Sequence, residues 1–362
     1  MRILLLSAAS SVHTLRWANA YAAAGNEVHV VTQHQPVEGY VNVAGMHHLP
    51  HRSGLGYVLN GERLRRLIGT LEPDVVNAHY ATGYGALARA VHEVPVVLNV
   101  WGSDVFDFPE KSALHRWWLR RNLLAADSLV STSEVMADRV RALLPERPRP
   151  EVVPFGVDMP HFAPRAPQSR TDGPVVIGTV KTLAAKYGID TLIKAFALLL
   201  TKPGMDGVML RIVGGGPDGV PLRDMVGAAG LRDRVAFVGA VPHAQVPDEL
   251  RKMDVFVALS RDDSESFGVA VIEASACGLP VVVSDAGGLP EVVVDGVTGS
   301  VVPRNDPASA ARELALLAGS RALRMERGAA GREHVRQHYE WGACVQRMSD
   351  ILQRCIARYR GR

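Results

Sequence analysis

Residues 254–278 read DVFVALSRDDSESFGVAVIEASACG, which contains a strand, a loop and a helix in succession. The apolar run Asp254–Leu259 predicts a buried strand, and Val269–Cys277 predicts an apolar helix that ends at Gly278. The first amides of such a helix have no partner inside it, and the helix dipole adds partial positive charge there. Because Gly268 has no Cβ, a phosphate can approach the backbone at this point. The stretch therefore predicts an α/β unit whose helix start binds a phosphate.

Two glutamates flank this predicted phosphate site. Glu273 is the one ionisable carboxylate in the apolar helix and lies roughly 7–8 Å along the axis from Gly268. A buried carboxylate needs partners, and a ribose attached to the phosphate has hydroxyl donors at that depth. Glu265 precedes the helix, so we expect it on the other side of the phosphates, beside a transferred sugar. The alternative interpretation puts Glu265 in a solvated acidic loop and pairs Glu273 with a core arginine.

The same alternation of short apolar runs and helical patterns fills the rest of the chain, which is typical of parallel α/β sheets. The expected strands are Ile3–Ser7, Glu27–Thr32, Asp74–Ala78, Val96–Val100 and Ser128–Ser131, then Val175–Thr179, Val208–Val213, Val235–Val238, Asp254–Leu259 and Pro280–Ser284. The expected helices include Thr14–Ala24, Asp190–Thr201, Val220–Ala229 and Val246–Lys252, and from Pro307 the pattern is purely helical. The proline-dense segment 145–150 cannot be a helix interior or a central strand, and we expect an interdomain linker at roughly 154–172. Two doubly wound domains are therefore predicted, with a cleft at the carboxyl ends of their strands.

Length, charge and cysteine content agree with this class. The 362 residues are too many for one ordinary core and suit two domains. A net charge of +3 is too small to indicate a nucleic-acid partner. Cys277, Cys344 and Cys355 share no metal-ligand spacing, and their odd number fits a reducing compartment. The apolar run Ile3–Leu6 is too short for a secretory signal and no stretch is long enough to cross a bilayer, so we expect a cytoplasmic protein.

The segment Glu265–Glu273 resembles the Glu-x7-Glu signature of glycosyltransferase family 4. The continuation Ala274–Glu291, the segment Asp295–Gly299 and the earlier Val153–Asp158 also follow that family, so the resemblance covers essentially the whole chain. It implies the GT-B architecture, in which two Rossmann-like domains face a cleft. Residues 1–155 would then form an acceptor domain and 156–340 a donor domain, with a C-terminal helix at about 341–362 that crosses back to the N-terminal domain.

The resemblance also implies an activity. It indicates retaining, metal-independent transfer of a hexose-type sugar from a nucleotide diphosphate sugar, with UDP- or GDP-sugars favoured and no cofactor. The acceptor would be a saccharide, lipid-linked or small-molecule hydroxyl, in cell-envelope or extracellular polysaccharide synthesis. In this family the first glutamate, here Glu265, contacts the donor sugar, and the second, here Glu273, contacts the ribose.

Two lysines are candidates for neutralising the diphosphate. Lys181 and Lys186 lie in the loop after the expected strand Val175–Thr179, where the family carries an arginine and a lysine five residues apart. Two ammonium groups can stabilise the charge that develops on the leaving diphosphate. Lysine lacks the bidentate geometry of arginine, which weakens the expected grip. The alternative is a pair of solvated surface lysines.

Further donor contacts are expected from loops at strand ends. The list of expected donor-binding residues comprises Ser10, Ser11, Gly214, Gly215, Val241, Glu265, Ser266, Phe267, Gly268, Val269 and Glu273. Gly214, Gly215 and Val241 would face the nucleobase, although glycines there also suit simple turns. The first loop, which carries the two serines, lacks the Gly-x-Gly-x-x-Gly of dinucleotide binders, and this argues against a nicotinamide enzyme.

On the acceptor or sugar side the sequence departs from the family. Trp101 stands where many members carry a histidine that contacts the donor sugar, and an indole cannot accept a hydrogen bond. His79 and Asp104 follow strand ends and are the nearest candidates to replace that contact. His79 is equally compatible with a structural hydrogen bond. His13 is either a surface loop residue or an acceptor contact.

The segment 111–124 has four fixed positive charges, no acid and paired tryptophans. This composition suits a helix that lies peripherally on the cytoplasmic face of an anionic membrane. The alternative is a core-packed helix with buried tryptophans and solvated arginines.

Three other functions are alternatives to sugar transfer. A sugar-nucleotide 2-epimerase on the same architecture needs acid–base groups at the sugar, and no such arrangement can be recognised in the sequence. A non-catalytic sugar-nucleotide sensor is disfavoured by the intact Glu265, Lys181 and Lys186. A Rossmann dehydrogenase is disfavoured by the missing fingerprint.

Overall fold

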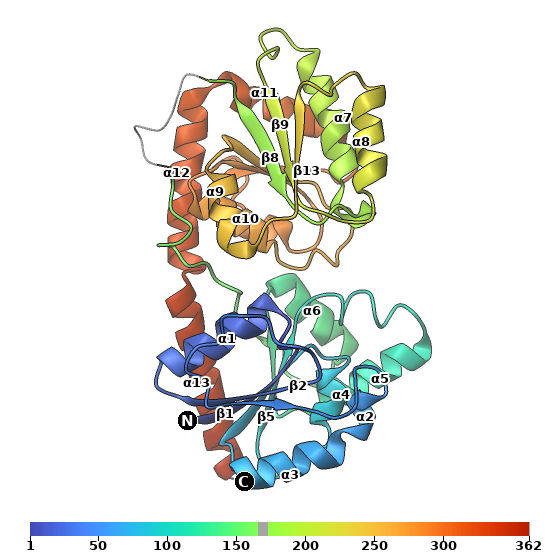
Figure 1. Ribbon diagram of the computed structural model, residues 1–362, viewed down its shortest axis with the longest axis vertical. Coiled ribbons are helices and arrows are strands. Elements are labelled where there is room, and N and C mark those ends of the chain that lie inside the picture. Colours follow the sequence, from blue (N-terminus) through green and yellow to red (C-terminus); the bar gives the residue numbers. More distant parts are fainter. Residues whose placement is uncertain (166–172, 362) are drawn as a thin grey trace. The chain divides into compact units, whose positions relative to one another are not determined.

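The computed structural model describes residues 1–165 and 173–361, so residues 166–172 of the expected linker and the last residue of the expected C-terminal helix lie outside it. The chain divides into two compact units. One comprises Met1–Phe155 with the C-terminal segment from Gly342, and the other comprises Gly156–Trp341 (Figure 1). Each unit is an α/β structure with its own parallel sheet.

The N-terminal unit contains a seven-stranded sheet in the order β3-β2-β1-β4-β5-β6-β7. Its strands are β1 (Arg2–Leu6), β2 (Glu27–Thr32), β3 (Gly45–His48), β4 (Val75–His79), β5 (Val96–Val100), β6 (Ser128–Ser131) and β7 (Glu151–Val152). All pairings are parallel. The order reverses between β1 and β4, which makes their carboxyl ends the expected ligand edge.

The helices of this unit are α1 (Val12–Ala23), α2 (Gly56–Leu59), α3 (Gly61–Leu71), α4 (Tyr84–Ala88), α5 (Ala113–Leu124), α6 (Glu134–Leu143) and α13 (Trp341–Arg360). Side chains from α3, α4, α5 and α6 pack with Leu4 and Leu6 of β1 in one continuous core. Strands β4 and β5 are buried along their whole length and β1 is buried after Arg2, as a parallel sheet covered by helices requires.

The last helix, α13, returns to the N-terminal unit. Its buried residues follow a helical spacing of three and four, namely Cys344, Met348, Ile351, Leu352, Cys355 and Ile356. Arg358 Nη2 donates to Ser128 Oγ at 2.8 Å, and Tyr359 donates its hydroxyl hydrogen to the His92 carbonyl at 2.6 Å. Arg360 also pairs with Asp74 at 2.6 Å. The crossing-back helix inferred from the family resemblance is therefore confirmed.

The second unit contains a six-stranded parallel sheet in the order β10-β9-β8-β11-β12-β13. Its strands are β8 (Val176–Val180), β9 (Met209–Val213), β10 (Val235–Gly239), β11 (Val255–Ala258), β12 (Val281–Ser284) and β13 (Gly299–Val302). The helical elements are η2 (Ala185–Tyr187), α7 (Ile189–Leu200), α8 (Gly219–Ala228), η3 (His243–Gln245), α9 (Val246–Leu250), α10 (Val269–Ala276), η4 (Leu289–Val292), α11 (Pro307–Gly319) and α12 (Arg321–His338). The order reverses between β8 and β11.

One face of this sheet packs on α7, α8 and α11 in a single apolar core that includes Phe196, Ile212 and Leu314. Helix α10 packs against α12 (Figure 1). Gly328 lets α12 approach the end of α10, because a Cβ there would lie 2.1 Å from the Gly278 carbonyl oxygen.

The prediction of two doubly wound α/β domains is confirmed, and most expected strands agree with the structure within one residue. Strands β3, β7 and β13 were not predicted. Among the described residues, no helix has both the length and the apolar character needed to span a bilayer.

Candidate functional site

The loops that follow β8, β9, β10 and β11 meet at the carboxyl edge of the second sheet. Lys181 N donates to the Val213 carbonyl at 3.0 Å, and Gly214 N donates to the Gly239 carbonyl at 2.8 Å. Arg261 N donates to the Lys186 carbonyl at 2.8 Å. These backbone bonds join the four loops around the point where the strand order reverses, the usual ligand position in such sheets.

Close backbone approach explains the glycines after β9. Gly214 has a φ of +143°, and a Cβ on it would lie 1.8 Å from the Lys181 carbonyl oxygen. Gly216 is similarly tight against Leu183. Close packing against the backbone therefore requires glycine at 214, whereas Gly215 is exposed and Val241 is half-buried in the neighbouring loop.

Glu265 and Lys181 form a direct ion pair. Lys181 Nζ lies 2.6 Å from Glu265 Oε2, and the two side chains are 13% and 9% exposed. Ser260 donates its hydroxyl hydrogen to the same carboxylate oxygen at 3.1 Å. The solvated-loop alternative is therefore wrong for Glu265, although its neighbours Asp262 and Asp263 are exposed.

Lys181 and Lys186 share an aromatic neighbour, Tyr187. Their Nζ atoms lie 4.7 Å and 4.9 Å from the centroid of the Tyr187 ring. A ring face attracts ammonium groups, so Tyr187 holds two like charges in one small volume. Both lysines are half-buried rather than fully solvated. The role of Tyr187 was not predicted, although its place next to Lys186 in the sequence offered a signal.

Helix α10 begins where the sequence predicted. Gly268 adopts a φ of +96° at the N-cap, and a Cβ on it would lie 2.9 Å from Leu289 Cδ2. Ser266 and Phe267, which precede it, are buried, and the Phe267 ring lies 5.7 Å from that of Tyr339. Val269 opens the helix and is half-buried.

Glu273 is buried on α10, 4% exposed, and its partner is a histidine. His243 Nε2 lies 2.8 Å from Glu273 Oε1, and the His243 side chain is 36% exposed. The alternative interpretation, in which Glu273 pairs with a core arginine, is therefore wrong. Sequence reasoning missed His243, yet its position two residues after Val241, in the loop expected to face the nucleobase, was a usable signal.

Four rings form a cluster in the N-terminal unit. The His13 ring stacks on the Phe155 ring with 4.1 Å between the ring centroids. It lies edge-on to the Trp101 ring with 5.7 Å between the centroids. Trp101 also contacts Phe155 at 5.5 Å and His79 at 4.9 Å. Three of the four residues predicted for the acceptor or sugar side therefore lie together.

Burial fixes the protonation state of His79. His79 is 1% exposed, and burial, with a smaller effect of His13, lowers its pKa to about 3, so the ring is neutral. Its Nδ1 is a buried atom with no hydrogen-bond partner in the described structure. The structural hydrogen bond considered for His79 is thus not present at Nδ1.

The prediction that Asp104 contacts the donor sugar needs correction. Its side chain is fully buried, and its carboxylate accepts hydrogen bonds from the backbone amides of Ala81, Trp101 and Gly102 at 2.8, 3.1 and 2.8 Å. Burial raises the pKa of Asp104, and these amides oppose that rise. Asp104 therefore fixes the turn that carries Trp101 and is closed to ligands.

The two serines of the first loop differ. Ser11 caps α1, because its hydroxyl oxygen accepts from His13 N at 3.2 Å. Ser10 is exposed. The Ser11 hydroxyl is therefore used as a helix cap, and the Ser10 side chain is accessible to a ligand.

Helix α5 occupies the tryptophan-rich segment and has two unlike faces. Trp118 is half-buried and donates Nε1–H to the Thr82 carbonyl at 3.4 Å, while Leu119 and Leu123 are buried. Leu114 and Trp117 are 68% and 48% exposed. The alternative with buried tryptophans is therefore met only in part at Trp118, which is half-buried, and is wrong for Trp117.

Within residues 1–165 and 173–361, no group of three or more histidine, cysteine or acidic side chains is arranged to hold a metal ion. Glu265 forms its ion pair with the ammonium group of Lys181, and Lys186 lies against the Tyr187 ring that Lys181 also contacts.

Comparison with protein families gives two matches. A model described as glycosyl transferases group 1 matches residues 163–334, and one described as glycosyl transferase 4-like matches residues 2–133. The first covers the loops that carry Lys181 and Glu265 and the helix α10 that carries Glu273. The second covers the part with His13, His79 and Trp101.

Known relatives agree with these matches. A GDP-mannose-dependent alpha-(1-6)-phosphatidylinositol monomannoside mannosyltransferase of Mycolicibacterium smegmatis is 30% identical over 309 residues, which cover 80% of this chain and 79% of that protein. A D-inositol 3-phosphate glycosyltransferase of Streptomyces coelicolor is 31% identical over 329 residues, with 80% and 70% covered.

Solved structures share the fold. A sucrose-phosphate synthase from Thermosynechococcus elongatus aligns with a TM-score of 0.84 at 22% identity over 99% of both chains. Anabaena HepE, in complex with UDP and glucose, aligns with a TM-score of 0.76 at 19% identity over 98% of this chain and 99% of its own.

Proposed function

Because the chain belongs to glycosyltransferase family 4, whose members have the GT-B fold, we propose that it transfers a hexose from a UDP- or GDP-sugar with retention of configuration and without a metal. The observation that carries this proposal is the Lys181–Glu265 pair, 2.6 Å long and largely shielded from water, beside the Gly268 start of α10. A cation and a carboxylate held together at a phosphate-binding helix start suit the junction of sugar and diphosphate.

Each group has a distinct role in the proposed donor complex. Glu273, whose Oε1 is held by His243, binds ribose hydroxyls through its other oxygen. The diphosphate lies at the amides that follow Gly268 and is neutralised by Lys181 and Lys186. Lys181 has three donor hydrogens, so it can keep Glu265 and still bind a phosphate oxygen.

The proposed reaction breaks the bond between the sugar C1 and the diphosphate oxygen. Charge moves onto the diphosphate, where the two ammonium groups stabilise it as it develops. The acceptor hydroxyl attacks C1 on the same face and forms the new C1–O bond. Its proton passes to a diphosphate oxygen, so no protein base is needed. Glu265 contacts the sugar while C1 carries positive character.

The relatives support the choice of substrate class. The names of the two proteins above specify a GDP-mannose donor, a phosphatidylinositol monomannoside and an inositol phosphate. For this chain we infer a UDP- or GDP-sugar donor and a lipid-linked, saccharide or small-molecule hydroxyl acceptor in cell-envelope synthesis. Trp101, with His13 beside it, supplies a ring surface for the sugar or the acceptor.

A donor screen tests the proposal directly. The protein is incubated without acceptor with UDP-, GDP- and ADP-sugars, in the presence and absence of EDTA, and released nucleoside diphosphate is measured. We expect slow release from a UDP- or GDP-sugar at the same rate in both conditions. Release that requires a divalent ion would contradict the metal-free mechanism. Absence of release from every donor would contradict donor activation as proposed.

We also propose that α5 contacts an anionic membrane surface. Leu114, Trp117 and Leu124 are exposed at helical spacing, and the guanidinium of Arg121 lies 5.0 Å from the Trp117 ring centroid. An apolar stripe with cations suits the interface of anionic lipids. The relative that acts on a phosphatidylinositol mannoside supports a lipid-linked acceptor.

Vesicle sedimentation tests this surface. We expect binding to phosphatidylglycerol vesicles but not to phosphatidylcholine vesicles, and loss of that binding in the Leu114→Ser/Trp117→Ser variant. Leu316→Ser is the matched control, because Leu316 on α11 is also exposed, at 54%. Equal sedimentation of the control and the α5 variant would contradict the membrane contact.

A further inference from the structure

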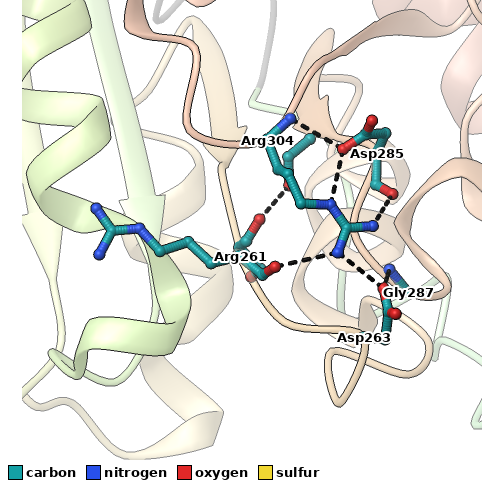
Figure 2. Close-up of polar contacts among 7 residues, drawn as sticks. Arg261, Asp263, Asp285, Gly287 and Arg304 are labelled. Atoms are coloured by element: carbon teal, nitrogen blue, oxygen red, sulfur yellow. Dashed lines mark hydrogen bonds and ion pairs between the residues drawn. The ribbon is translucent and has the colours of Figure 1, made fainter.

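Arg304 follows β13 and reaches the loop that carries Glu265. Its Nη1 donates to the Arg261 carbonyl at 3.1 Å and to Asp263 Oδ1 at 2.9 Å, as Figure 2 shows. Its Nε and Nη2 donate to Asp285 Oδ1 and to the Asp285 carbonyl at 3.1 and 2.7 Å. One guanidinium therefore joins the loop after β11 to the loop after β12.

The loop after β12 in turn holds the backbone of Glu265. Gly287 N donates to Asp263 Oδ1 at 3.2 Å, and Gly288 N donates to the Glu265 carbonyl at 2.9 Å. A Cβ on Gly287 would lie 2.3 Å from the Glu265 carbonyl oxygen, so this contact requires glycine. Arg304 therefore holds two segments: the Glu265 loop, and the loop after β12 that is hydrogen-bonded to the Glu265 backbone.

Arg261 anchors the other end of the same loop to the loop after β8. Its side chain pairs with Asp190 and donates to Thr191 Oγ1 at 3.1 Å, and its amide binds the Lys186 carbonyl. Its own carbonyl is the group that accepts from Arg304. Arg304 therefore binds the backbone of Arg261, and Arg261 binds the backbone of Lys186. The two arginines together connect the loop of Glu265 to the loop of Lys186.

The exposure of these groups argues for a geometric role. The side chains of Arg304, Asp263 and Asp285 are 35%, 58% and 50% exposed. Ion pairs this exposed add little to stability, because water and salt screen them. A planar guanidinium with five donors nevertheless fixes orientation, which a flexible ammonium does not.

We propose that Arg304 is a positioning residue for sugar transfer: it holds the 261–265 loop so that the Glu265 carboxylate, paired with Lys181, meets the donor sugar. This inference rests on the proposed function of Glu265. Arg304 touches neither sugar nor diphosphate. Its loss therefore acts on the transferred sugar and leaves the nucleotide contacts at Glu273 in place.

The test compares Arg304→Ala and Arg304→Lys with the wild type. For Arg304→Ala we expect kcat/KM for the donor sugar to fall about tenfold or more, because a small displacement of a positioned group is costly in the transition state. The dissociation constant of the nucleoside diphosphate, which lacks the sugar, should change less than about twofold. Arg304→Lys should restore part of the activity through one of the two carboxylates.

Arg336→Ala is the matched control, because Arg336 pairs with Glu333 on α12 of the same unit and is 61% exposed. It should leave both constants unchanged. A parallel loss of nucleotide affinity, activity and thermal stability in Arg304→Ala would overturn the positioning role, and so would activity equal to that of the control.

Amide hydrogen exchange separates this inference from the proposed function. We expect faster exchange at 261–266 in Arg304→Ala than in wild type, measured without any substrate. If the wild type turns over no donor, the proposed function fails. Unchanged exchange at 261–266 in Arg304→Ala would overturn the positioning role of Arg304, whether or not the wild type is active.

Discussion

Glu273 Oε1 lies 2.8 Å from His243 Nε2, and in the proposed donor complex the other carboxylate oxygen binds a ribose hydroxyl. We expect Glu273→Ala to weaken nucleoside diphosphate binding about 10- to 100-fold, because hydrogen bonds to a charged group contribute more than neutral ones. Turnover at saturating donor should change less. Isothermal titration with UDP and GDP measures the affinities, and an unchanged dissociation constant would remove Glu273 from the site.

His243 is the partner that sequence reasoning missed, and it offers a second test of the same carboxylate. His243→Gln keeps a hydrogen-bond donor near Glu273 Oε1, whereas His243→Ala leaves a buried acceptor without its partner. Nucleotide affinity should therefore be near that of wild type in the first variant and reduced in the second. Equal affinities in both would show that His243 does not orient Glu273.

Lys186 is expected to act mainly in the transition state. Lys186→Ala should lower kcat about 10²- to 10³-fold, since it removes a charge aimed at the leaving diphosphate. Lys194→Ala is the control, because Lys194 pairs with Asp190 on α7 and is 53% exposed. Steady-state kinetics with saturating donor measures both, and equal kcat values would contradict the role of Lys186.

His79 makes stability depend on pH in a calculable direction. Burial lowers its pKa from 6.5 in the unfolded chain to about 3 in the folded protein, so between these values only the unfolded chain binds the proton. The free energy of unfolding therefore falls as pH drops below 6.5, by at most about 1.4 kcal/mol per pH unit from this residue. His79→Phe should show a shallower loss in urea titrations between about pH 7 and pH 5. An unchanged slope would contradict the burial argument.

Residue roles were only partly predictable. The Lys181–Glu265 pairing joins residues 84 positions apart and follows from the strand order at β8 and β11, which sequence spacing does not specify. Asp104 followed a strand end as ligand residues do, but its carboxylate serves backbone amides instead. A short polar residue after a strand suits both roles, so the pattern alone was ambiguous.

At the scale of elements, the start of α10 depends on Gly268. An L-residue with a φ of +96° is strained, and its Cβ would press on Leu289. Gly268→Ala should therefore cost about 1–2 kcal/mol or more of unfolding free energy and also weaken nucleotide binding. Gly230→Ala is the control, because Gly230 has a φ of +69° with no atom within 4 Å of the added Cβ. If both variants lose equal stability and bind nucleotide equally well, the helix start is not the phosphate site.

Elements with a strong apolar pattern were predicted well, and weakly patterned ones were missed. The strand Glu27–Thr32 is buried at every position after the first, so its apolar pattern fits few structures other than a buried strand. In contrast, β3 contains a glycine and two histidines and is mostly half-buried at the sheet edge. Strand β7 has only two residues and immediately follows the proline-rich segment. Edge strands such as these form because a neighbour offers hydrogen bonds, which local sequence does not reveal.

At the scale of the whole molecule, the chain passes from the first unit to the second near Phe155 and returns near Trp341. Val157 and Glu340 form a bridge, in which Val157 N donates to the Tyr339 carbonyl at 2.7 Å and Trp341 N donates to the Val157 carbonyl at 3.0 Å. The outgoing segment at Val157 and the returning segment at 339–341 are therefore hydrogen-bonded to each other within the second unit. The predicted donor groups lie in that unit, apart from Ser10 and Ser11.

We propose that the carboxyl ends of β8, β9, β10 and β11 form the nucleotide site. Amide hydrogen exchange across the whole chain, with and without UDP or GDP, tests it most directly. We expect slower exchange with the nucleotide at 181–187, 214–216, 241–243 and 265–273, and no change at Gly45–His48, an edge strand of the N-terminal unit. Protection absent from all four segments with both nucleotides, or found only in the N-terminal unit, would contradict it.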